Sequence, residues 1–132
     1  MIKLPDKILV ATEPVSMQLS FDRLAGIVRE HLGGEPREEL VVVFHNRRRT
    51  HLKLLWHDRG GYCILYKRLD RGVYRIPLAI PADARRVVVS RRELSLLFEG
   101  VDIQVVRSAQ RRWRERRHPA RISAPAPAAS IN

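Results

Sequence analysis

Basic side chains gather at three places along this 132-residue chain, and each grouping has the chemistry of a contact with a polyanion. The first is the run Arg47, Arg48 and Arg49, followed closely by Lys53. Adjacent guanidinium groups cannot neutralise one another, and they gain most by displacing counterions from a phosphate backbone. We predict that this run binds nucleic acid. The alternative is a charged turn that only keeps the surface solvated.

The second grouping interleaves aromatic and basic residues between Tyr66 and Arg75. Its basic members are Lys67, Arg68, Arg71 and Arg75. Aromatic rings can stack on unpaired bases while arginines hold the phosphates. Trp56, Tyr62 and Tyr66 are therefore candidates for base stacking. Core packing, or the ordinary preference of aromatic residues for strands, is the alternative for each.

The third grouping is an arginine-rich extension over residues 107–118. Its nucleic-acid-binding candidates are Arg111, Arg112, Arg114, Arg116 and Arg117. Such an arm can follow a groove or fold as it binds. We interpret it as a second anchor for nucleic acid, with a tail of no consequence as the alternative.

The charge balance also favours a polyanionic partner. The chain has 25 Lys and Arg against 14 Asp and Glu, a formal net charge of +11, and 21 of the basic residues are arginine. Residues 1–40 carry a net −2, residues 41–89 a net +8 and residues 107–132 a net +6. Arginine's planar fork suits phosphate better than lysine's point charge does. DNA is the expected partner, ahead of RNA, and no membrane partner is expected.

Catalytic and metal chemistry find little support in the sequence. His45, His51 and His57 recur every six residues, a spacing unlike that of metal ligands, and no cysteine pair assists them. Asp58 lies in a turn and Glu93 at a helix cap, and no nucleophile elbow or phosphate-binding loop is present. We expect no enzyme activity, and therefore no catalytic residues, metal, cofactor or small-molecule substrate.

Composition predicts one packed domain in a reducing compartment. Hydrophobic residues make up 45% of the chain, and no apolar run approaches the ~20 residues of a membrane helix. The first ten residues lack the apolar centre of a secretory signal, and the single cysteine, Cys63, fits a cytoplasmic protein. We divide the chain into a domain over residues 1–106, the arginine-rich extension and a disordered Pro/Ala tail over residues 119–132.

We expect the elements that position these side chains to form an α+β fold. This fold is an antiparallel β-meander of about four to five strands packed by two helices. The strands are expected at residues 8–11, 40–44, 52–56, 62–66 and 73–76. A first helix follows Ser20 and ends at Gly33-Gly34, and a second is bounded by a capping box at Ser90 and by Gly100. The pattern for a third helix, from Val105 to Arg117, is weak.

Alternation along the strands predicts two different sheet faces. Turns centred on Arg47-Arg48 and Arg59-Gly60 place one apolar set together, which should receive the helices: Val41, Val43, Leu52, Leu54, Trp56, Cys63 and Leu65. The other face mixes aliphatic, aromatic and basic groups: Val42, Phe44, His51, Lys53, Leu55, Tyr62, Ile64, Tyr66 and Arg68.

One long stretch resembles a known family. The segment from Phe44 to Tyr62 contains a basic turn, Lys-x-Leu-x-Trp and a His-Asp-x-x-Gly turn, and it continues through Tyr66-Lys67-Arg68-Leu69-Asp70-Arg71-Gly72 to Pro77. Together with Leu97, Glu99, Gly100, Val101 and Asp102, this pattern is similar to that of the TnpB accessory proteins, encoded by the second open reading frame of the insertion sequence sixty-six family. The resemblance spans about residues 8–103. One motif departs, since Ser16, Gln18 and Leu19 stand where the family carries Asp, Arg and Lys.

The resemblance implies a bacterial mobile element and a non-enzymatic protein that assists a separate, element-encoded DDE-type transposase. The expected function is therefore accessory to DNA transposition, with DNA bound through arginine-rich phosphate contacts by a nucleoid-associated cytoplasmic protein. Two alternatives stay open. One is a protein–protein interaction module that docks on the transposase without touching DNA. The other is an RNA-binding module.

Overall fold

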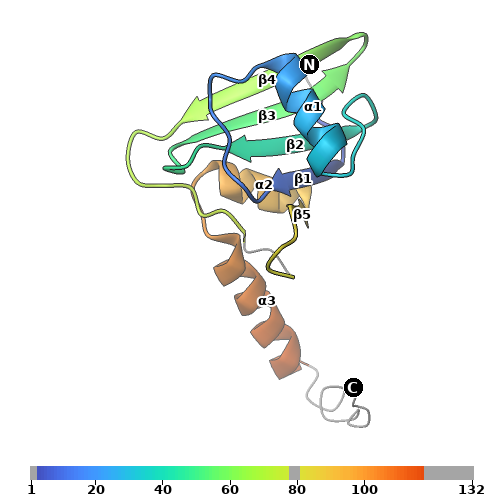
Figure 1. The fold of residues 1–132 in the computed structure, drawn as a ribbon. Coiled ribbons are helices and arrows are strands. Elements are labelled where there is room, and N and C mark those ends of the chain that lie inside the picture. The colour runs from blue at the N-terminus through green and yellow to red at the C-terminus, as the bar shows by residue number, and fades with distance from the viewer. Residues whose placement is uncertain (1–2, 78–80, 118–132) are drawn as a thin grey trace.

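A computed structural model describes residues 3–77 and 81–117 of the chain as an α+β fold (Figure 1). Five strands make one sheet: β1 (Lys7–Ala11), β2 (Leu40–His45), β3 (His51–Asp58), β4 (Gly61–Arg68) and β5 (Arg86–Val89). The three helices are α1 (Phe21–His31), α2 (Arg91–Phe98) and α3 (Ile103–Arg117). The α+β class predicted from the sequence is confirmed. The Pro/Ala tail lies outside the described residues.

The sheet is mixed, with the strand order β4-β3-β2-β1-β5. The β2-β3-β4 meander is antiparallel as predicted, but β1 pairs in parallel with β2, because α1 carries the chain back across the sheet between them. The carboxyl ends of β1 and β2 therefore meet at one end of the sheet, together with the β2–β3 turn and the start of β5. This shared end positions the candidate site.

The predicted facing of the strands is confirmed, but both faces are covered. On one face Val41, Val43 and Leu54 pack with Leu94 and Leu97 of α2. On the other, apolar residues of β1, β2 and β3 pack against α1: Leu9, Val42, Phe44 and Leu55 on the strands, with Leu24, Ala25 and Val28 on the helix. The expectation that the apolar face receives the helices is thus incomplete, since α1 buries most of the mixed face. Only its end near Tyr66 stays open, where Tyr66 is 51% exposed.

In the segment after β4, the one predicted strand is absent and a strand that was not predicted is present. Residues 73–76 form no strand, because the chain crosses the α2 face there and buries Tyr74 in the core. The edge strand instead comes later, at Arg86–Val89, where three consecutive valines pair antiparallel with β1. β-Branched residues favour strands, so this run of valines is a local signal for β5. The prediction placed the strand at 73–76 instead.

The helices follow their local signals to different degrees. Ser90 makes the predicted capping box at α2, with its hydroxyl accepting from the Glu93 amide and the Glu93 carboxylate accepting from the Ser90 amide. Ser20 occupies the N-cap position of α1, but its side chain makes no capping hydrogen bond. Helix α3 runs without a break across position 106, the predicted domain boundary, and extends away from the sheet (Figure 1). No helix among residues 3–77 and 81–117 is long and apolar enough to cross a membrane.

Candidate nucleic-acid interface

The turn between β2 and β3 presents Arg47, Arg48 and Arg49 on the surface, and all three are exposed. Asn46 builds this turn. Its side-chain oxygen accepts from the backbone amides of Thr50 and His51, both at 2.9 Å. Because Asn46 closes the loop on itself, the three guanidinium groups project from a defined backbone rather than from a free loop.

The same network fixes the ring of His51. The Asn46 amide nitrogen donates to the Thr50 hydroxyl at 3.0 Å, and that hydroxyl lies 2.7 Å from His51 Nδ1. The amide nitrogen also lies 3.2 Å from Nδ1 and can only donate, so Nδ1 accepts. The neutral His51 ring therefore carries its proton on Nε2. The sequence pattern assigns Asn46 only to a turn, and its role in orienting the imidazole was not predicted.

Three more arginines lie at this end of the sheet. Arg68 is paired with His51 across the β3–β4 ladder. The segment after β4 is held to the arginine turn by two backbone bonds, from the Leu69 amide to the Thr50 carbonyl and from the Tyr74 amide to the Arg49 carbonyl. This brings the exposed Arg71 and Arg75 to the same region.

We call this set the basic end: Arg47, Arg48, Arg49, Arg68, Arg71 and Arg75. Within the described residues, none of its six guanidinium groups forms an ion pair or a side-chain hydrogen bond. Glu13 and Asp83 line a hollow of about 490 Å³ beside Arg47 and Arg49, and Asp70 lies between Arg68 and Arg71 in the chain. The basic end therefore keeps a surplus of positive charge.

The two predicted lysines lie elsewhere. Lys53 is only 8% exposed, and its ammonium donates to the carbonyls of Met17 and Leu19 at 2.6 and 2.8 Å. Lys67 lies on the opposite face, where its ammonium donates to the Phe98 carbonyl at 2.8 Å. Both amines are therefore engaged in joining loops and helix ends to the sheet.

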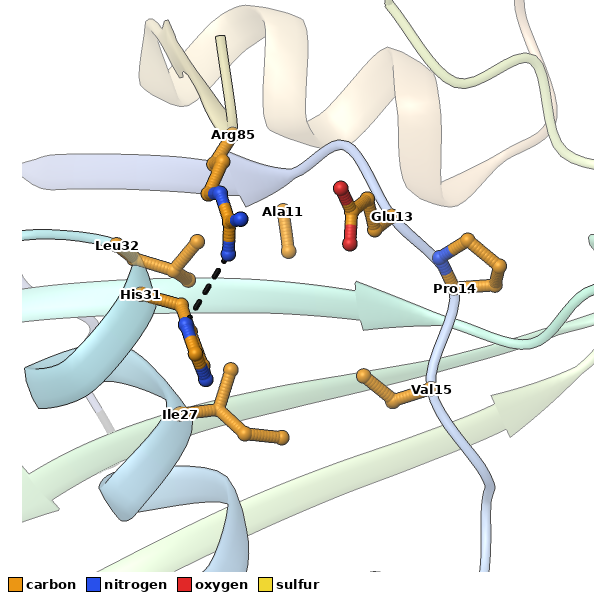
Figure 2. A pocket seen from close by; sticks show the side chains of 8 residues that line it. All are labelled: Ala11, Glu13, Pro14, Val15, Ile27, His31, Leu32 and Arg85. Atoms are coloured by element: carbon orange, nitrogen blue, oxygen red, sulfur yellow. Dashed lines mark hydrogen bonds between the residues drawn. The ribbon is translucent and has the colours of Figure 1, made fainter. Parts of the chain in front are cut away.

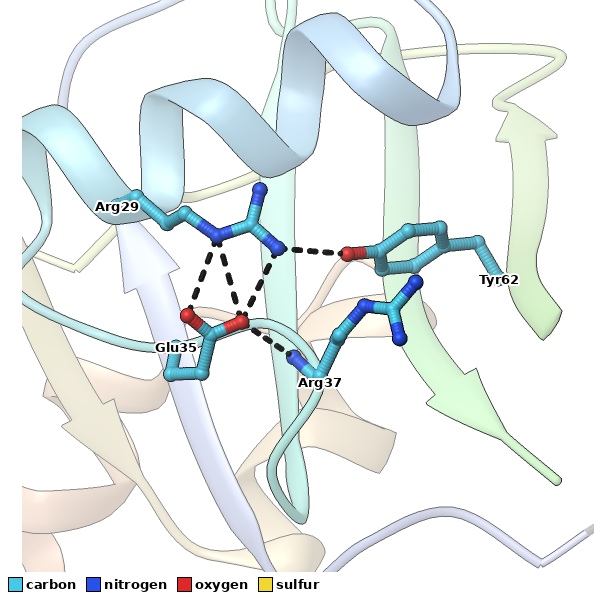
Figure 3. Close-up of polar contacts among 4 residues, drawn as sticks. All are labelled: Arg29, Glu35, Arg37 and Tyr62. Carbon is cyan, nitrogen blue, oxygen red and sulfur yellow. Dashed lines mark hydrogen bonds and ion pairs between the residues drawn. The ribbon is translucent and has the colours of Figure 1, made fainter. Parts of the chain in front are cut away.

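The three aromatic candidates for stacking are separated by the fold. Trp56 is 5% exposed within the core, so packing is its role in this structure. Tyr62 lies at the other end of β4, where its hydroxyl accepts from Arg29 and where the Arg37 guanidinium lies 5.9 Å from the ring centroid (Figure 3). Arg29 also pairs with Glu35, so one of the two guanidinium groups around Tyr62 is neutralised. Tyr66 alone of the three lies beside the basic end.

The candidates of the arginine-rich extension lie on α3. Arg111, Arg112, Arg114 and Arg116 are exposed on this helix, and Arg117 is its last residue. They are not brought into the basic end. The helical spacing spreads their charges around the axis instead of gathering them on one face.

A separate cavity lies where the ends of α1 and β1 meet. It measures about 310 Å³ and is lined mainly by apolar groups, including Ala11, Val15 and Ile27 (Figure 2). At one side the Arg85 guanidinium donates to His31 Nδ1 at 3.1 Å. The cavity combines an apolar floor with two basic groups and the carboxylate of Glu13. Among the described residues, no group of three or more His, Cys, Asp or Glu side chains is placed to hold a metal ion.

Together, the fold and the basic end define a small, arginine-rich α+β protein whose charged groups face outward at one end of a mixed sheet. The chain belongs to the family described as IS66 Orf2 like protein, whose model matches residues 6–108. The family connects it with an accessory role in transposition of an insertion sequence and is not a known enzyme family.

Two curated relatives come from Sinorhizobium fredii (strain NBRC 101917 / NGR234). The uncharacterized protein y4hO is 34% identical over 108 residues, which cover 82% of this chain and 89% of the relative. The uncharacterized protein y4jC is 29% identical over 96 residues, which cover 73% of this chain and 80% of the relative. No solved structure matches the chain.

Proposed function

We propose that this protein is a non-enzymatic DNA-binding accessory factor for transposition, and that it holds DNA by its phosphates at the basic end. One observation carries the proposal: six exposed arginines from two separate segments converge at one sheet end without ion-pair partners among the described residues. Such groups gain free energy by replacing the counterions of a phosphate backbone. The exposed arginines of α3 supply a second, separate contact.

The test is fluorescence anisotropy of a labelled DNA duplex titrated with protein over a range of salt concentrations. Log affinity should fall steeply with log salt for the wild-type chain. The triple variant Arg47→Gln, Arg48→Gln, Arg49→Asn should flatten that slope by up to about 3 units, roughly one for each phosphate that is no longer neutralised. Asparagine is chosen for Arg49 because this residue has a φ of 59°, a conformation that asparagine tolerates.

A matched control removes the same kind of charge from the other end of the sheet. Arg59 lies in the two-residue β3–β4 turn with a φ of 43°, so Arg59→Asn makes a backbone and charge change like that at Arg49. It should leave the salt slope near that of the wild type. A reduction of the slope by Arg59→Asn as large as that by the single variant Arg49→Asn, or no salt-dependent affinity for DNA in the wild type, would contradict the proposal.

The cavity at the α1–β1 junction favours a second candidate function, docking on the transposase. Its apolar floor would accept an apolar side chain, and the polar rim of Arg85, His31 and Glu13 could bind polar groups beside that side chain. The test is a nuclease-treated pull-down of the element's transposase at high salt. Ile27→Glu, which places a charge at the cavity wall, should abolish capture if this surface is used.

A further inference from the structure

An exposed aromatic pair lies directly beside the basic end. Tyr66 is 51% exposed, and its ring centroid lies 5.8 Å from that of His51, with the planes tilted by 38°. Lys53 places its ammonium 4.8 Å from the Tyr66 centroid, over the ring. Since the Lys53 amine is also bound to two backbone carbonyls, it holds the tyrosine in place while leaving half of the side chain open to solvent.

Two hollows connect this pair with the arginine turn. One measures about 270 Å³ and is lined by His51, Tyr66 and Arg68. The other measures about 470 Å³ and is lined by Arg47, Arg48 and His51 together with the loop at Pro14–Met17. His51 lines both hollows. A chain molecule lying in them would meet guanidinium groups, then an imidazole, then a tyrosine.

This order of groups suits an unpaired nucleotide better than a duplex. The bases of a duplex are stacked on one another, and a ring on a protein surface meets only their edges or the sugar–phosphate backbone. An unpaired base offers its π-face to an exposed aromatic ring, while neighbouring arginines neutralise the phosphates on either side. The His51 Nε2–H adds a hydrogen-bond donor between the two.

We infer that the hollows between the arginine turn and Tyr66 bind single-stranded DNA, with a base stacked on Tyr66 and the flanking phosphates on Arg47, Arg48 and Arg68. The inference rests on the proposed function for the phosphate contacts and adds to it the class of DNA. Unpaired DNA then becomes the preferred ligand of this surface, and duplex is bound through phosphates alone.

The test compares a labelled oligodeoxythymidine strand with a duplex of equal length in anisotropy titrations of the full chain. Tyr66→Ala should weaken binding of the single strand by about tenfold or more and leave duplex affinity unchanged. Tyr66→Phe should keep the wild-type affinity, because stacking needs the ring and not the hydroxyl. Leu65→Ala, at a neighbouring side chain that is 42% exposed on the other face of β4, serves as the matched control.

A second probe removes the base instead of the ring. A strand carrying abasic sites should bind the wild-type protein about as weakly as the intact strand binds Tyr66→Ala. The far-ultraviolet circular dichroism and melting temperature of each variant check that the fold is intact. Because Tyr66 is exposed, its replacement leaves both cores unchanged.

The outcomes separate the two proposals. If duplex binds with steep salt dependence while Tyr66→Ala changes neither ligand, the single-strand inference is wrong and the proposed function stands. If the wild type binds neither duplex nor single strand, both fail. Tighter binding of single-stranded RNA than of DNA, abolished in Tyr66→Ala, would overturn the assignment to DNA.

Discussion

Lys53 shows how one side chain can fasten a loop to a sheet. Its ammonium is buried and satisfies two carbonyls of the loop before α1, at Met17 and Leu19. This loop also lines the hollow beside Arg47 and Arg48, so the lysine connects the core with the candidate interface.

We predict that Lys53→Met lowers the free energy of unfolding by about 2–3 kcal/mol, because two carbonyls lose a charged donor. Urea unfolding followed by tryptophan fluorescence measures the change. Lys7→Met, at an exposed lysine, is the control and should change stability by no more than about 0.5 kcal/mol. Equal stability of Lys53→Met and the wild type would show that the two hydrogen bonds contribute nothing net.

His45 makes stability depend on pH. Burial lowers the pKa of its imidazole below the ordinary value, although backbone hydrogen bonds, the largest with Asn46, partly oppose this. The unfolded chain takes up a proton as the pH falls below about 6.5, whereas the folded His45 resists protonation until lower pH. The contribution of this group to the free energy of unfolding is therefore complete above that pH and declines below it.

The corresponding prediction compares the wild type with His45→Gln. Urea midpoints measured between about pH 8 and about pH 5.5 should fall more for the wild type than for the variant, because the variant has no imidazole to protonate at this position. The same pH-dependent decrease in both proteins would mean that another group is responsible.

At the scale of elements, α1 and α2 offer a comparison within one molecule. Both helices begin after a serine, but only Ser90 makes side-chain capping bonds. Ser90→Ala should cost about 1 kcal/mol, and Ser20→Ala only a few tenths. Thermal unfolding of the two single variants checks this, and a destabilisation by Ser20→Ala as large as that by Ser90→Ala would contradict it.

Local elements could be predicted from the sequence because their signals are local. The period of two along β3 and β4 assigned side chains to faces, since the Arg59-Gly60 turn fixes the register of the hairpin. The predicted β2–β3 turn, centred on Arg47-Arg48, lies slightly before the observed one. It still gave the correct faces, because the resulting shift in pairing is even and preserves the alternation.

The pairing of strands that are distant in the sequence, and the covering of a side chain by a distant loop, could not be predicted in the same way. Nothing in the sequence around Ile8–Val10 indicates that β1 lies between β2 and β5. Pairing with strands 30 or more residues away produces no pattern in the local sequence. The engagement of Lys53 was missed for a similar reason. Lys53 alternates onto the mixed face of the sheet, and that position predicts an exposed side chain. Only the structure shows that the loop containing Met17 covers it.

At the scale of the whole molecule, the basic end and α3 are two charged surfaces on separate supports. Removing residues 107–132 deletes seven arginines and one glutamate, including the exposed Arg111, Arg112, Arg114 and Arg116. The side chains that the structure describes in this segment, at residues 109 and 111–116, are all exposed. The truncation therefore changes charge far more than packing.

We predict that the truncated chain keeps its melting temperature within about 2 °C but that its salt slope on duplex DNA is flatter by up to about 4 units, one for each phosphate bound by the helix. Differential scanning fluorimetry and anisotropy titrations measure the two quantities. An unchanged slope would mean that α3 does not touch DNA, and a large drop in melting temperature would mean that the helix supports the fold.

The interior position of β1, between β2 and β5, governs the order in which this sheet can be completed during synthesis. The β2-β3-β4 meander is local and can form as soon as Arg68 has left the ribosome. The first strand emerges earliest, yet one of its edges stays unpaired until Arg86–Val89 has been made, almost 80 residues later. Closing a loop of that length is slow compared with forming a hairpin, and an open strand edge invites pairing with other chains. The chain thus spends much of its synthesis with one edge of this interior strand unpaired, and the pairing of β5 completes the sheet.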